Sequence, residues 1–159
     1  MNASVKGALV LGVTVAILGL VFAVAGLHTN PMAAFAFVIL AVLLNIGVII
    51  WTLRATRSTN GYGGQLLAGV VIGLVAGVII FASSWTMTGV IFPDYYDEMY
   101  DGYLEFFENA GMDEAQIDKQ MAALENVTPA GPALQGAIGT IITSVVVAAI
   151  AGIFLRRKD

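Results

Sequence analysis

The sequence has no cysteine, one histidine and few charged residues. Without cysteine, the chain can form no disulfide, no thiolate nucleophile and no cysteine-ligated metal site. The only histidine, His28, follows the first long apolar run, and no His–Asp–Ser arrangement typical of a catalytic triad can be assembled around it. We therefore expect no enzyme activity, no cofactor and no metal site, and we interpret His28 as a solvent-exposed turn residue.

Charge is scarce throughout most of the chain. Only 11% of the 159 residues are charged and 58% are hydrophobic, whereas about 25% are charged in an average soluble domain. A soluble fold could not bury so much apolar surface, so the lipid bilayer must solvate part of the chain. Basic residues do not cluster with aromatic ones, and we expect no nucleic-acid partner. Composition thus predicts an all-α integral membrane protein surrounded by membrane lipid.

One segment, residues 92–133, has the composition of a water-soluble protein. It contains ten of the eleven acidic residues and one basic residue, Lys119. Apart from Lys6 at its edge, the long apolar runs outside this acidic segment contain no charged side chain and no histidine. Proton pumps and ion-coupled carriers need charged groups within the membrane, so we do not expect an active transporter.

Four apolar runs are long enough to cross a bilayer as helices, which takes about 20 residues. Ala23-Val24-Ala25 resembles a signal-peptide cleavage site, but the apolar run before it exceeds the usual length of about 7–15 residues. We therefore interpret this run as a retained span, and we expect Pro93 to close the third span. The predicted spans are 5–27, 32–53, 65–90 and 134–155, so that residues 1–91 hold three spans, 92–133 the acidic segment, and 134–159 the fourth span and a basic tail.

The basic residues predict the orientation of the bundle. Six of the seven lie at the N-terminus, between the second and third spans, or at the C-terminus: Lys6, Arg54, Arg57, Arg156, Arg157 and Lys158. With four spans these places share one side of the membrane, which the positive-inside rule makes the cytoplasm. Both termini are then expected to be cytoplasmic, and the acidic segment to be extracytoplasmic.

The acidic segment is predicted to form a helical hairpin. Aromatic residues and Met99 recur at spacings of three and four over residues 94–110, and Gly111 is a typical helix stop. Asp113, with Gln116 three residues later, resembles a capping box that opens a second helix. The opposite face of the first helix carries a stripe of carboxylates, which we interpret as a solvated face and a possible partner surface rather than a cation site: Asp94, Asp97, Asp101, Glu105 and Glu108.

Small residues recur along three of the four spans. Such residues let helix backbones approach closely in lipid, so these positions are predicted to close the bundle internally, or to leave one face for a partner or a second copy. They are Gly12, Gly19 and Gly26 in the first span, Gly69, Gly73 and Gly77 in the third, and Gly136, Thr140 and Ser144 in the fourth. Asn45 is the most polar group within a span, and it is expected either to bond between helices or to line a pore.

Several motifs resemble those of a known family. They are Gly-Tyr-Gly-Gly-Gln (61–65), Ile-Phe-Pro-Asp-Tyr-Tyr (91–96), Gly-Met-Asp-Glu-Ala-Gln-Ile-Asp (111–118) and the Arg-Arg-Lys that ends the fourth span. Together with the four spans, they resemble the bacterial domain-of-unknown-function 4199 family of small membrane proteins, over nearly the whole chain. The resemblance implies a multi-pass protein of the bacterial cytoplasmic membrane, and it implies no activity.

These observations lead to two hypotheses of different classes. The first is a non-enzymatic accessory or scaffolding subunit, which contacts a protein partner or another copy through the acidic segment and the small-residue helix faces. The alternative is an oligomeric pore or passive transporter lined by Asn45 and by the serine and threonine residues of the third and fourth spans. A weaker third hypothesis is an outside-facing sensor of a ligand or cation.

Overall fold

The structure is a computed structural model that describes residues 2–157. Within these residues it contains α-helices and two short helical turns, and no strand. Four helices are long and apolar enough to cross a membrane, which confirms the prediction of an all-helical chain with four candidate spans. They are α1 (Ala3–Val24), α2 (Pro31–Ala55), α3 (Tyr62–Thr86) and α6 (Ala130–Phe154).

Local capping signals set the turn between α1 and α2. Asn30 caps α2, because its side-chain oxygen accepts hydrogen bonds from two backbone N–H groups of the first turn at 2.9 and 3.2 Å. Pro31 follows at the first helical position, where its missing N–H costs nothing. α1 ends at Val24, three residues earlier than predicted, because Gly26 adopts a left-handed conformation (φ 67°) before a 3₁₀ turn, η1 (Leu27–Thr29).

The ends of α3 and α6 also differ from the predicted boundaries. α3 begins at Tyr62, so that Gly63 and Gly64 lie in its first turn rather than in the predicted loop. At its other end the helix continues into a π-helical turn, η2 (Met87–Ile91), and stops before Pro93, as predicted. α6 begins at residue 130, four residues earlier than expected.

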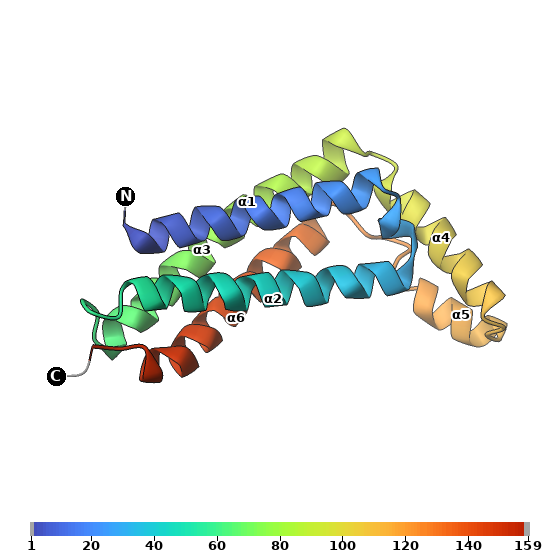
Figure 1. The fold of residues 1–159 in the computed structure, drawn as a ribbon. Coiled ribbons are helices and arrows are strands. Elements are labelled where there is room, and N and C mark those ends of the chain that lie inside the picture. Colours follow the sequence, from blue (N-terminus) through green and yellow to red (C-terminus); the bar gives the residue numbers. More distant parts are fainter. Residues whose placement is uncertain (1, 158–159) are drawn as a thin grey trace.

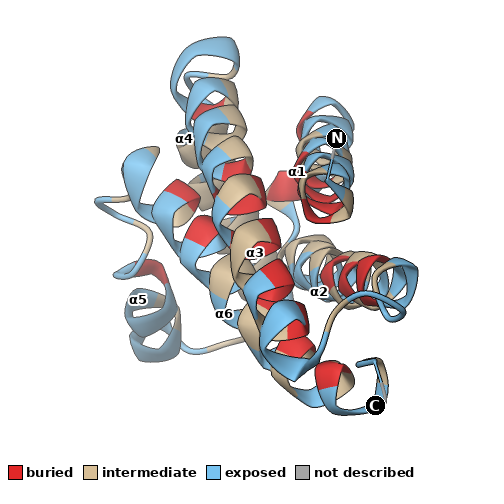
Figure 2. Ribbon diagram, turned by 90° about the vertical axis from the view of Figure 1, so that its left-hand side faces the viewer, coloured by how far each residue is buried: buried red, intermediate tan, exposed pale blue. Residues whose placement is uncertain are grey.

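The long helices run alongside one another, with both ends of the chain at one end of the bundle and α4 and α5 at the other (Figure 1). α3 packs most extensively on α6 and next on α1, whereas α2 packs on α1 and α6 and makes few contacts with α3. Burial is correspondingly uneven (Figure 2). In its most apolar stretch, 11% of α2 is buried, against 39% for α3 with η2, so α2 is the least enclosed wall of the bundle.

A buried glutamine joins three helices at the end of the bundle near the chain termini. Gln65 of α3 is fully buried, and its amide nitrogen donates to the carbonyl oxygens of Leu53 in α2 at 3.0 Å and of Leu155 after α6 at 2.6 Å. Its amide oxygen accepts a hydrogen bond from the Thr56 hydroxyl at 2.9 Å. The last carbonyl groups of a helix have no partner within the helix, so one side chain satisfies groups at the ends of two neighbouring helices.

α4 (Tyr95–Asn109) and α5 (Glu114–Met121) pack against each other beyond η2. Gly111 has φ 72° and ends α4, and Asp113 caps α5 by accepting a hydrogen bond from a backbone N–H at 2.9 Å. α4 also lies directly on η1, where Gly102 faces Thr29 so closely that an added Cβ would lie 3.0 Å from its Cα atom. This contact holds α4 against the turn between α1 and α2.

Candidate functional site: acidic face and bundle cavity

Four of the predicted small residues lie where an added side chain would press on a neighbouring helix. A Cβ atom added at Gly12 would lie 2.9 Å from the Ile79 side chain of α3. At Gly69, Gly73 and Gly77 of α3, an added Cβ would come within 3.0 to 3.3 Å of backbone atoms of α6. The hydroxyl-bearing Ser144, also predicted, is fully buried on α6. α3 therefore uses its glycine face inside the bundle, against α6.

The other predicted small residues have different surroundings. The prediction for Gly26 is wrong, because this residue lies in the turn after α1, has a positive φ and has nothing within 4 Å of an added Cβ. An added Cβ at Gly19 or Gly136 would have its nearest neighbour at 3.8 and 3.7 Å, respectively. Both glycines, together with Thr140, line a cavity within the bundle.

Asn45 connects α2 to α6. It is buried, its amide nitrogen donates to the Thr140 carbonyl oxygen at 3.2 Å, and its amide oxygen accepts a hydrogen bond from the Ser144 hydroxyl at 3.2 Å. Both partners belong to α6. These hydrogen bonds hold α2 to α6, whereas its close glycine contact is with α1, where Gly7 packs on Thr52.

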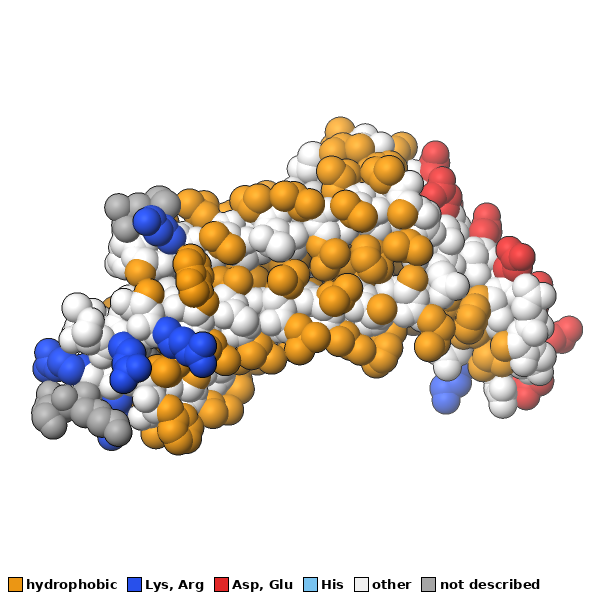
Figure 3. All heavy atoms as spheres, in the orientation of Figure 1, with side chains coloured by type: hydrophobic (Ala, Val, Ile, Leu, Met, Phe, Trp, Pro, Cys, Tyr) orange, Lys and Arg blue, Asp and Glu red, His pale blue; other side chains and the backbone are white. Residues whose placement is uncertain are grey.

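The five carboxylates predicted as a partner surface lie along α4 and its first cap, and all are exposed. We call Asp94, Asp97, Asp101, Glu105 and Glu108 the acidic face. None of them forms a salt bridge within residues 2–157. In the same part of the chain, no group of three acidic or histidine side chains is placed to hold a metal ion. In the space-filling view, acidic side chains gather at the α4 end and most basic ones at the opposite end (Figure 3), while Lys119 belongs to α5.

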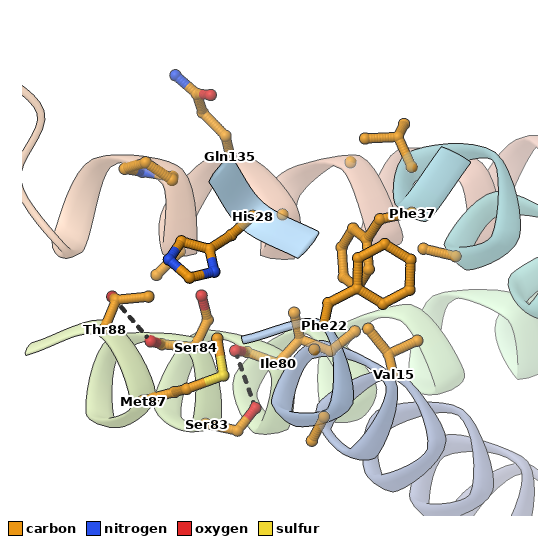
Figure 4. A pocket seen from close by; sticks show the side chains of 18 of the residues that line it. Val15, Phe22, His28, Phe37, Ile80, Ser83, Ser84, Met87, Thr88 and Gln135 are labelled. Carbon is orange, nitrogen blue, oxygen red and sulfur yellow. Dashed lines mark hydrogen bonds between the residues drawn. The ribbon is translucent and has the colours of Figure 1, made fainter. Parts of the chain in front are cut away.

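A cavity of about 1120 Å³ lies between the four long helices, in the half of the bundle nearest α4. We call it the bundle cavity. Most of its wall is aliphatic, and Phe22 of α1 and Phe37 of α2 meet edge to face at a centroid distance of 5.2 Å within it. The close-up shows these two rings at one side and a polar group around His28 at the other (Figure 4).

His28 lies at the end of the bundle cavity near α4. Contrary to the expectation of a solvent-exposed turn residue, it is 5% exposed, because α4 covers η1. Its Nε2 lies 3.0 Å from a carboxylate oxygen of Glu98, and its ring stacks on Tyr95 at 4.3 Å. Its Nδ1 is buried and has no hydrogen-bond partner among residues 2–157.

Tyrosines of α4 surround this end of the cavity and stay protonated over a wide pH range. Burial, and then the neighbouring Tyr96 and Tyr103, raise the pKa of Tyr95 to about 12. Burial also raises the pKa of Tyr96, although a hydrogen bond with Thr88 acts in the opposite direction. Each phenol therefore keeps its proton and can donate a hydrogen bond at neutral pH.

Sequence reasoning missed His28, Gln65 and the bundle cavity. Gln65 could have been noticed, since an amide at the start of an apolar span needs a partner in lipid. The burial of His28 depends on α4 folding back onto η1, a contact between residues 70 positions apart. Sequence periodicity carries no signal for such a contact.

Comparison with known proteins adds one finding. Among the curated proteins and the solved structures, no match was found. The model of the family described as protein of unknown function (DUF4199) matches residues 6–157. Because this match covers nearly the whole chain, the protein belongs to the DUF4199 family.

Proposed function

We propose that the protein is a multi-pass protein of the bacterial cytoplasmic membrane, with both termini in the cytoplasm and α4 and α5 forming an extracytoplasmic acidic hairpin. Support comes from the distribution of charge, because most basic side chains lie at the end of the apolar bundle opposite to the acidic ones (Figure 3). Loops rich in lysine and arginine stay on the cytoplasmic side during insertion.

Within this topology we propose a non-enzymatic accessory or scaffolding role, in which the acidic face contacts a basic surface of a partner subunit. The observation that carries this proposal is that five exposed carboxylates follow one another on α4 with no salt bridge within residues 2–157. Asp97, Asp101 and Glu105 are spaced four residues apart, an arrangement in which like charges destabilise a helix. A basic partner surface would replace this repulsion between carboxylates by attraction and so stabilise α4.

The packing of the bundle limits which surfaces are available to a partner. The close glycine contacts of α3 are already used against α6. The small-residue faces therefore offer less free surface than the sequence indicated. All five residues of the acidic face are exposed, and it is the surface that we assign to a partner.

Removing charge from the acidic face should release the partner. We expect the triple variant Asp97→Asn, Asp101→Asn, Glu105→Gln to lose a stoichiometric foreign subunit that accompanies the unchanged protein after gentle detergent extraction from native membranes. Size and mass-spectrometric composition of the purified particle measure this. The control removes two charges from α5, through Glu114→Gln and Asp118→Asn, and should keep the subunit. A particle that contains only this chain, before and after substitution, contradicts the accessory role.

A substitution at Asn45 distinguishes the pore hypothesis from this proposal. We expect Asn45→Leu to cost about 0.6–2 kcal/mol, the range for interhelical hydrogen bonds in membranes, and to leave assembly intact. Equilibrium unfolding in bicelles gives the stability, and flux of small solutes into liposomes gives the transport activity. Flux through the unchanged protein that disappears in Asn45→Leu, with assembly preserved, would favour the pore instead.

A further inference from the structure

The bundle cavity has a polar end and an apolar interior. His28 follows the end of α1, and Tyr95 and Tyr96 belong to α4, so the polar groups gather where the spans end. Towards the middle of the spans the wall is mainly aliphatic and aromatic, with Leu11 and Phe37 among the lining residues, although Asn45 and Thr140 also line it. A lipid has the same arrangement, with its head at the membrane surface and its chain inside.

The unpartnered nitrogen of His28 indicates what kind of head fits. Its Nε2 is engaged by Glu98 at 3.0 Å, while Nδ1 is buried with no partner among residues 2–157. A buried polar atom without a hydrogen bond is costly. The Ser84 side chain points from α3 towards the His28 ring (Figure 4). A hydroxyl fits here, because its O–H can donate to Nδ1 of a neutral imidazole whose Nε2–H faces Glu98.

We propose that the bundle cavity binds an amphipathic lipid molecule from the membrane, with a hydroxyl-bearing head at Nδ1 of His28 and an apolar chain running between the spans. At about 1120 Å³ the cavity lies just above the roughly 300–1,000 Å³ of common ligand sites. It is not sealed from the bilayer, since Ile17 and Val38 line it and are 57% and 55% exposed. A chain can therefore enter sideways, from the lipid.

The head decides the selectivity of this site. An apolar chain gains little by moving from the bilayer into an aliphatic cavity, because lipid tails are as apolar as leucine. Nδ1 of His28 is buried, and leaving a buried polar atom without a hydrogen-bond partner is costly. Two molecules with the same chain and different heads should therefore bind with different affinities.

The test uses the full-length protein in phosphatidylcholine nanodiscs. The probe is a long-chain fatty alcohol with a photoactivatable group on its chain, and the comparison molecule is its methyl ether, which cannot donate a hydrogen bond. We expect the alcohol to label peptides of α1, α2 and α6 that line the cavity, and the ether to need about tenfold more probe for equal labelling. His28→Phe, which keeps a ring against Tyr95, should remove the difference between the two probes.

A pair of glycine variants separates the cavity from the outer surface. Gly139 lines the cavity and has nothing within 4 Å of an added Cβ, so Gly139→Leu should fold, fill part of the space and reduce labelling by the alcohol. Gly47 also has open space but does not line the cavity, so Gly47→Leu should leave labelling unchanged. Equal labelling by both probes, or labelling unaffected by both His28→Phe and Gly139→Leu, would show contact with bulk lipid only and overturn the proposal.

Discussion

Replacing Gly73 by leucine is expected to lower the free energy of unfolding by about 3 kcal/mol, the upper part of the usual cost of overpacking a well-packed interior. An added Cβ at Gly73 would lie 3.0 Å from the Cα atom of Ile141 and from the Cβ atom of Ser144. A backbone atom cannot rotate away, so α3 and α6 must move apart along their main interface. Equilibrium unfolding of the protein in bicelles with a denaturing detergent measures the loss.

The same substitution at Gly47 provides a matched control. Gly47 also lies in the interior of a long helix, but nothing lies within 4 Å of an added Cβ, and the residue is exposed. Leucine has a higher helix propensity than glycine by somewhat less than about 1 kcal/mol, so Gly47→Leu should leave stability unchanged or raise it slightly. If the two variants unfold at the same detergent fraction, the close approach of α3 to α6 is not a source of stability.

Gln65→Leu is expected to have the second largest effect, a loss of about 2 kcal/mol. Leucine is similar in size, so the packing around position 65 changes little. The substitution removes both donated hydrogen bonds, and it leaves the Leu155 carbonyl oxygen without the donor now at 2.6 Å. A buried acceptor left unsatisfied costs about 1–3 kcal/mol, and the Thr56 hydroxyl also loses its side-chain acceptor.

The appropriate control makes the same chemical change at an exposed amide. Gln120 lies in α5, where its side chain is exposed, so Gln120→Leu should change the unfolding free energy by less than about 0.5 kcal/mol. Hydrogen exchange gives a second measurement, because Gln65→Leu should increase exchange near Leu53 and Leu155. Unchanged hydrogen-exchange protection near Leu53 and Leu155 would show that the amide of Gln65 does not hold α2 and α6 together.

Much of the fold was predictable because lipid imposes simple rules. A long apolar run must satisfy its own backbone in a bilayer, which leaves a helix as its structure. The ends of the helices were less predictable, because the backbone conformation and the capping residues at a helix end decide where it stops, whatever the hydropathy of the sequence there. Gly26 is apolar enough to extend the first span, yet its left-handed conformation ends α1 before it.

The candidate site was only partly predictable. Exposure of the acidic face follows from helical spacing, since carboxylates on one side of an amphipathic helix face water. The cavity does not follow, because it arises where α2 packs less closely than its neighbours. Gly19 and Gly73 look alike in the sequence. An added Cβ would meet α6 backbone at 3.0 Å at Gly73, whereas at Gly19 its nearest neighbour would be the end of the Met87 side chain at 3.8 Å.

The order of synthesis of the four spans has a consequence for α6. It is the last of the four in chain order, yet the hydrogen-bond partners of Asn45 and one of those of Gln65 lie in it or directly after it. Until α6 arrives, the glycine face of α3 lacks its main neighbour. In an assembly of the first three spans alone, Asn45 therefore lacks both of its side-chain hydrogen bonds, and the amide of Gln65 lacks one of its three.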